Sequence, residues 1–233
     1  MKKNKLFCIP CAGGTADAYL RWDNILHYSI ELCPIELKNR GKRGNEPAYK
    51  DILEAVDDVF NKIKDLIKDN NYALFGHSMG ALIVYELYYK LLENSIPVPN
   101  NIFIYGKEPP NIPYKGIKHY KLSNEELKNS IAELGGTPEE VLKDDDVYNF
   151  FAPIIRADFE ITEKYIFRDK KELMACNIIV INGKEDKLSS KNLEEYKKYT
   201  IKNCYIHKIS GGHFELYERP FDTVRLINKY LVK

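Results

Sequence analysis

The most constraining feature of this sequence is the pentapeptide Gly76-His77-Ser78-Met79-Gly80. The apolar run 72–75 before it predicts a buried strand, and apolar residues at helical spacing after it predict a helix. A serine between two glycines at such a turn is typical of a nucleophile elbow, because the missing side chains let the backbone turn sharply. The N-terminus of the following helix would also favour developing negative charge. We therefore predict that Ser78 is a nucleophile, the alternative being a chance match in a loop.

Composition excludes several classes of function. The chain has 233 residues, 44% of them hydrophobic, which is enough for a core in one α/β domain with an insertion or in two small domains. Lys and Arg (35) nearly balance Asp and Glu (34), so the net charge of +1 provides no basic field for nucleic acid. The first apolar run is too short for a signal peptide or a membrane span, and five cysteines form no disulfide framework. We expect a cytoplasmic protein that does not enter a membrane.

Strands and helices alternate over most of the chain. Apolar runs predict strands at 6–9, 30–37, 72–75, 101–106, 177–183 and 204–209. Helical patterns lie at 15–27, 50–68, 82–91 and 193–199. This alternation favours an α/β fold with a mostly parallel sheet and helices on both faces. Pro34 suggests that the second strand lies at an edge of the sheet. Trp22 is expected in the core rather than at a ligand-binding site.

The pattern changes between the fourth and fifth strands. Residues 108–170 show no convincing strand, but they contain two candidate capping boxes, Ser123 to Glu126 and Thr137 to Glu140. A longer helical stretch, 145–167, contains Pro153, which predicts a kink or boundary. We interpret 108–170 as a helical lid inserted into a single domain, 1–233. A second independent domain is the alternative.

A nucleophilic serine needs a base, an acid that orients the base, and oxyanion donors. Asp186 lies just past the end of the strand 177–183, in the segment Lys184-Glu185-Asp186, with Glu185 as the competing carboxylate. His213 lies on a glycine-flanked loop after the last strand, and the order Ser78, Asp186, His213 is that of α/β-hydrolases. The other histidines, His27, His77, His119 and His207, are interpreted as structural.

Two loops have open interpretations. The segment after the first strand, Pro10 to Thr15, contains a glycine pair, so the backbone N–H groups of Ala12 and Met79 are the predicted oxyanion donors, an ordinary turn being the alternative. Cys8 and Cys11 have redox or metal-binding spacing, although buried thiols are the favoured interpretation. The basic loop 39–44 is predicted either to contact a phosphate or to be a solvated turn.

Five motifs together resemble the type II thioesterases, stand-alone α/β-hydrolases that accompany nonribosomal peptide and polyketide synthases. They are the opening motif 6–14, the elbow 76–80, the lid motif 134–142, the start of the last lid helix at 156–160 and the histidine loop 211–214. The lid motif is the most specific, because generic esterases share only the elbow and triad. The chain departs from the family at Cys11, where an aromatic residue is more usual, and in the loop 37–41.

The resemblance implies hydrolysis of acyl groups carried as thioesters on the phosphopantetheine arm of an acyl- or peptidyl-carrier protein, with acyl-CoA as a surrogate substrate. It implies no cofactor and no metal. A carboxylesterase or lipase acting on oxygen esters is the nearest alternative. A non-catalytic binding protein of the same fold is a more distant one.

Overall fold

A six-stranded sheet forms the centre of the molecule in the computed structural model, which describes residues 3–69, 71–186 and 191–232. The strands are β1 (Asn4–Ile9), β2 (Ile30–Pro34), β3 (Tyr72–His77), β4 (Asn101–Tyr105), β5 (Asn177–Gly183) and β6 (Cys204–Ile209). Their spatial order is β2-β1-β3-β4-β5-β6, and every neighbouring pair is parallel. The predicted fold class is confirmed, and β2 lies at an edge as Pro34 indicated.

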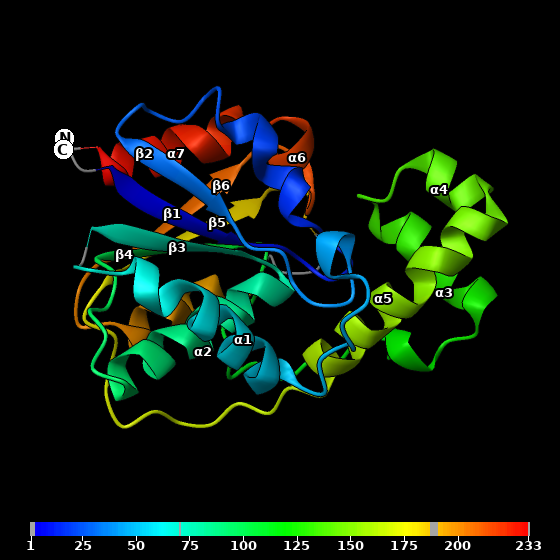
Figure 1. The fold of residues 1–233 in the computed structure, drawn as a ribbon, viewed down its shortest axis with the longest axis horizontal. Helices are drawn as coiled ribbons and strands as arrows, with labels where there is room; N and C mark the ends of the chain where they lie inside the picture. The colour runs from blue at the N-terminus through cyan, green and yellow to red at the C-terminus, as the bar shows by residue number, and fades with distance from the viewer. Residues whose placement is uncertain (1–2, 70, 187–190, 233) are drawn as a thin grey trace.

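Helices cover both faces of the sheet. Successive residues of a strand point to opposite faces, so Phe7 packs in one core cluster and Cys8 in the other. The first cluster includes α1 (Ile52–Ile63) and α2 (Met79–Glu93), and the second includes the 3₁₀ helix η1 (Ala16–Trp22), α6 (Glu215–Glu218) and α7 (Phe221–Leu231). Figure 1 shows α1 and α2 on one side of the sheet and α7 on the other.

Several predicted elements are shorter than expected, including the helices predicted at 50–68 and 145–167, which are α1 (Ile52–Ile63) and α5 (Asp145–Glu163). The helix predicted at 15–27 is only η1, where Tyr19 and Trp22 are fully buried and hydrogen-bond to distant backbone carbonyls. Trp22 is therefore a core residue, as predicted. The strand predicted to reach Leu37 ends at Pro34, because Pro34 pairs with Cys8 and β1 itself ends one residue later.

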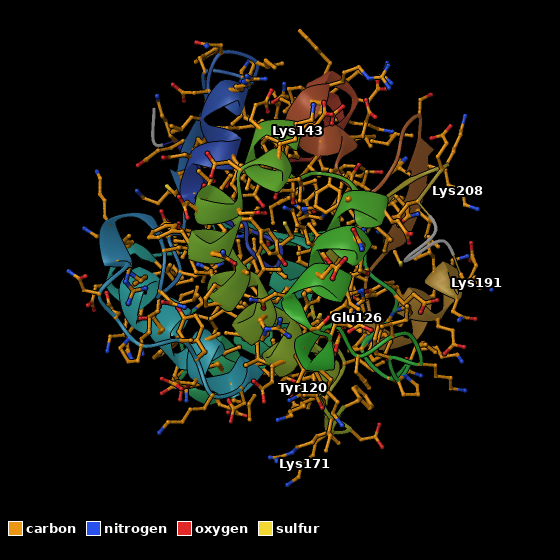
Figure 2. All side chains as sticks on the ribbon, turned by 90° about the vertical axis from the view of Figure 1, so that its right-hand side faces the viewer. Tyr120, Glu126, Lys143, Lys171, Lys191 and Lys208 are labelled. Atoms are coloured by element: carbon orange, nitrogen blue, oxygen red, sulfur yellow. The ribbon has the colours of Figure 1, made fainter. Side chains whose placement is uncertain are left out.

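Residues 107–176, between β4 and β5, contain helices and no strand. The helices are the 3₁₀ helix η4 (His119–Lys121), α3 (Asn124–Leu134), α4 (Glu139–Lys143) and α5 (Asp145–Glu163). They share a small apolar cluster of their own, formed by Leu127, Ile131, Tyr148 and Ala152. Figure 1 shows α3, α4 and α5 together beyond the carboxyl ends of β1 and β3. Figure 2 looks onto this side, with Glu126 of α3 and Lys143 of α4 in front.

The caps of these helices only partly follow the sequence pattern. Ser123 and Glu126 form the predicted capping box, with reciprocal side-chain to backbone bonds. The second predicted box is wrong, because α4 is capped by Pro138 and Thr137 falls one position too early. Pro153 lies inside α5, so it marks no boundary.

The last 3₁₀ helix, η5 (Leu193–Tyr199), matches its predicted range. None of the helices in the described ranges combines the length and the apolar character that crossing a bilayer requires.

Candidate active site

Ser78 occupies a strained backbone position between β3 and α2. Its φ is 53° and its ψ is −109°, a conformation that a residue with a side chain adopts at a cost. The flanking glycines make the turn possible. A Cβ on Gly76 would lie 2.3 Å from the Gly80 carbonyl oxygen, and a Cβ on Gly80 would lie 2.2 Å from the carbonyl oxygen of Ile9. The sharp turn predicted from the pentapeptide is present.

The loop after β1 lies beside this turn. Ile9 pairs with Gly76, so both strands end at the same edge of the sheet, and their following segments meet there. Met79 is the first residue of α2, where a backbone N–H has no partner inside the helix. Ala12 lies in the neighbouring loop, which closes with a hydrogen bond from Gly14 N–H to the Cys11 carbonyl at 3.0 Å. The predicted oxyanion donors thus belong to two adjoining segments.

His213 and Asp186 come together at the same edge. The Nδ1 atom of His213 lies 2.8 Å from Oδ2 of Asp186, and both side chains are buried. Glu185 is exposed, and its own backbone N–H donates to the Gly211 carbonyl. The imidazole is thereby held on its Nδ1 side. Within the described part of the chain it makes no hydrogen bond to the Ser78 hydroxyl.

The remaining histidines have other neighbours. His27 Nδ1 contacts Ser29 Oγ at 2.7 Å and His207 Nε2 contacts Tyr230 Oη at 2.8 Å. His119 Nδ1 lies 2.6 Å from Glu163 Oε1.

His77 Nδ1 lies 2.9 Å from Tyr217 Oη, and its ring centroid is 4.8 Å from that of His213. Burial lowers the pKa of His77 well below its ordinary value, and the nearby His213 adds to that effect. The neutral imidazole of His77 therefore contacts the Tyr217 hydroxyl and lies beside the His213 ring. The sequence placed His77 in the elbow but gave no sign of this partner.

The two cysteines of the Cys-x-x-Cys pair are buried free thiols. Burial raises the pKa of Cys8 well above its ordinary value and that of Cys11 to about 11. Since the thiolate is the reactive form, neither thiol has the character of a redox cysteine. This agrees with the favoured interpretation of both as core residues.

The basic loop 39–44 is only partly a solvated turn, because Lys42 is exposed but both arginines pair with carboxylates. Arg40 is 3% exposed, and its guanidinium forms a bidentate pair with Asp158 of α5. Arg43 pairs with Asp58 of α1 in the same manner. Asp158 is the residue that sequence reasoning overlooked, since it was noted only as part of a motif at the start of the last lid helix.

Two cavities adjoin these residues. One of about 700 Å³ is lined by His213 and Asp186 on the sheet side and by Leu134 of α3. Another of about 360 Å³ is lined by Ala12 and Phe214, and Leu134 contributes to its wall as well. The helical segment between β4 and β5 therefore forms part of the walls around the candidate site.

Comparison with known proteins shows the family of this chain. A family model described as a thioesterase domain matches residues 4–231. The gramicidin S biosynthesis protein GrsT of Aneurinibacillus migulanus is 34% identical, and the match covers 98% of this chain and 89% of that protein. The medium-chain S-acyl fatty acid synthase thioesterase of Homo sapiens is 31% identical, over 98% of this chain and 86% of that protein.

Solved structures give the same result. The crystal structure of ClbQ from the colibactin NRPS/PKS pathway superposes with a TM-score of 0.93 at 28% identity, covering 98% of this chain and 96% of that one. The structure of the type II thioesterase BorB from the borrelidin biosynthetic cluster has a TM-score of 0.88 at 27% identity, covering 98% of this chain and 93% of that one. Because the family model covers almost every residue and the identity to GrsT exceeds 30%, this chain belongs to the thioesterase family, as its motifs predicted.

Proposed function

We propose that this thioesterase removes acyl groups from the phosphopantetheine arm of carrier proteins in nonribosomal peptide or polyketide synthesis. The observation that carries the proposal is the strained Ser78 at the edge of the sheet where His213 is held by Asp186. The names of GrsT and ClbQ support this class of pathway. We place the reaction in the cytoplasm, with acyl-CoA as a surrogate substrate and neither nucleic acid nor membrane as a partner.

The first half of the reaction acylates the serine. The Ser78 oxygen attacks the thioester carbonyl while Nε2 of His213 takes the hydroxyl proton, and Asp186 stabilises the imidazolium through Nδ1–H. The carbonyl oxygen becomes an oxyanion that accepts hydrogen bonds from the N–H groups of Ala12 and Met79. The carbon–sulfur bond then breaks, and the leaving thiol takes the proton from His213.

The second half releases the acyl group. A water molecule gives a proton to His213 and attacks the acyl-serine, forming a second oxyanion in the same hole. Collapse of this intermediate breaks the ester bond, and the proton returns from His213 to the Ser78 oxygen. A carboxylic acid leaves and the enzyme is regenerated.

The proposal is tested with Ser78→Ala. We expect kcat/KM on an acyl-carrier protein to fall on the order of 10⁴-fold or more, with the fold retained, because the nucleophile is lost. A fluorophosphonate probe should label the wild type and fail to label the variant. Ser95→Ala is the matched control, since Ser95 is also a serine with positive φ and lies in the turn after α2.

Two results would contradict the proposal. One is substantial activity in a folded Ser78→Ala protein, which would remove the nucleophile assignment. The other is a strong preference for p-nitrophenyl esters over acyl thioesters, which would favour a carboxylesterase. The assay includes aminoacyl and medium-chain fatty acyl thioesters, because one relative is named for gramicidin S biosynthesis and the other for a medium-chain fatty acid synthase.

A further inference from the structure

A buried ion pair ties the loop after β1 to helix α5. Asp158 is 2% exposed, yet its Oδ2 accepts the backbone N–H of Gly13 at 2.8 Å. The Arg40 guanidinium contacts both carboxylate oxygens, with Nη1 2.7 Å from Oδ2 and Nη2 2.8 Å from Oδ1. Burying a lone carboxylate is unfavourable, and the bidentate pair with its added hydrogen bond offsets that cost.

Arg40 holds the same loop from its other side. Its Nη1 donates to the Gly14 carbonyl at 3.0 Å, and its Nε donates to the Lys38 carbonyl at 3.1 Å. Gly13 itself has a φ of 71°, and Ile155 of α5 packs so closely that a Cβ on Gly13 would lie 2.7 Å from its Cγ1 atom. The loop is therefore fixed by a carboxylate, a guanidinium and a side chain of α5.

Hydrogen bonds hold the peptide units on both sides of Ala12. The peptide unit between Ala12 and Gly13 is planar, so the bond from Gly13 N–H to Asp158 fixes the orientation of that whole plane. The Ala12 N–H lies in the preceding planar unit, together with the Cys11 carbonyl, and that carbonyl accepts the Gly14 N–H at 3.0 Å. With both constraints in place, the Ala12 N–H has little freedom to rotate.

We infer that Asp158, neutralised by Arg40, is a positioning residue for the oxyanion hole. The inference rests on the proposed function, in which Ala12 N–H stabilises the oxyanion. A donor aligned before the reaction stabilises the transition state most, and a misplacement of about 1 Å can cost 10²-fold in rate. Arg40 serves a second purpose, because an unpaired carboxylate so close to the oxyanion would repel it.

The test compares Asp158→Asn with Asp58→Asn. Asp158→Asn keeps the side-chain shape and removes the charge that pairs with Arg40. We expect kcat to fall on the order of 10²-fold with little change in KM. Affinity for a trifluoromethyl ketone analogue, whose adduct with Ser78 carries an oxyanion, should fall by the same factor as kcat/KM. Asp58→Asn also breaks a bidentate arginine pair in this region, but its partner Arg43 otherwise donates to the Glu36 carbonyl and to Glu46, so both quantities should stay unchanged.

All rates are divided by the active-site concentration from fluorophosphonate titration, which separates misfolding from misalignment. If Asp158→Asn loses no more analogue affinity than Asp58→Asn, the inference is wrong. Arg40→Lys gives a second test if Asp158→Asn does not fold, because lysine keeps the charge and lacks the fork that contacts both Asp158 oxygens. An unchanged analogue affinity in Arg40→Lys would also overturn it. A wild type without thioesterase activity would instead contradict the proposed function.

Discussion

At the scale of single residues, two adjacent carboxylates have different surroundings. A turn closed by Asp186 N–H to the Gly183 carbonyl directs the Asp186 side chain inward, whereas Glu185 is exposed. The sequence favours Asp186 because of its short reach and because its spacing matches that of the family it resembles. The structure supplies the contact with His213 that separates the two candidates.

We therefore predict a large loss of kcat for one amide variant and little change for the other. Asp186→Asn should lower kcat on the order of 10⁴-fold, because the amide favours the wrong imidazole tautomer. Glu185→Gln, the matched control, should change kcat by no more than a few-fold. Steady-state kinetics on one acyl-carrier substrate measures both, and the reverse ranking would assign the orienting acid to Glu185.

His77 makes stability depend on pH. Its pKa is lowered by burial in the folded protein, so below its ordinary value near 6.5 the unfolded chain binds a proton that the folded protein does not. Acid therefore favours unfolding, and as the pH falls below 6.5 this residue should reduce the free energy of unfolding by up to about 1.4 kcal/mol per pH unit. Urea denaturation of wild type and His77→Gln across this range should show a shallower slope for the variant. Parallel profiles would contradict the prediction.

At the scale of elements, close backbone packing fixes the serine turn. Helix α2 starts so near the end of β1 that residue 80 has no room for a side chain. Such contacts explain why the turn was predictable, since few residue types fit it. The start of α4 was not predictable in the same way, because a threonine, a proline and two glutamates are compatible with more than one cap position.

Gly80→Ala tests this packing. The new Cβ would lie 2.2 Å from the Ile9 carbonyl oxygen, a backbone atom that cannot move without disturbing the sheet. We expect the free energy of unfolding to fall by about 3 kcal/mol, as for an overpacked core. Gly44→Ala is the control, because its nearest non-adjacent atom is 3.5 Å away and its φ is −59°. If urea denaturation gives the two variants the same free energy of unfolding, the contact with the Ile9 carbonyl does not reduce stability.

At the scale of the whole molecule, the segment between β4 and β5 has an apolar cluster of its own and also contacts the loop after β1 through α5. Leu127 and Ile131 pack within the segment itself, whereas Asp158 and Ile155 of α5 contact the loop after β1. We propose that this segment, 108–170, is the lid. We then expect α3 and α4 to move when a phosphopantetheine arm enters, while α5 stays in contact with the loop after β1.

The lid leads to a prediction about substrates. A carrier protein cannot enter the site, so only its arm and acyl group pass beneath the lid, and carrier contacts should form on the outer lid surface. We expect kcat/KM for an acyl-carrier protein to exceed that for the matching acyl-CoA. Phe150 of α5 is 71% exposed, and Phe150→Ser should reduce the carrier value on the order of tenfold with the CoA value unchanged. Phe221→Ser, at an equally exposed site on α7, is the control, and equal values for carrier and CoA would contradict the prediction.

The sequence by itself determined the alternating layout of the sheet, the serine turn and the candidate residues Ser78, Asp186 and His213. The spacing of apolar residues indicates strands and helices, and the glycine spacing indicates the sharp serine turn, because both depend on local backbone geometry. The order of the three candidate residues along the chain is that of α/β-hydrolases.

Only the tertiary structure decided which distant side chains meet. Arg40 and Asp158 are 118 positions apart, and His77 and Tyr217 are 140 apart. A charge or ring in a sequence shows no partner until the packing of whole elements brings one within a few ångströms and removes the water between them. For that reason a loop that read as a solvated turn contains a buried arginine that holds the loop beside Ser78.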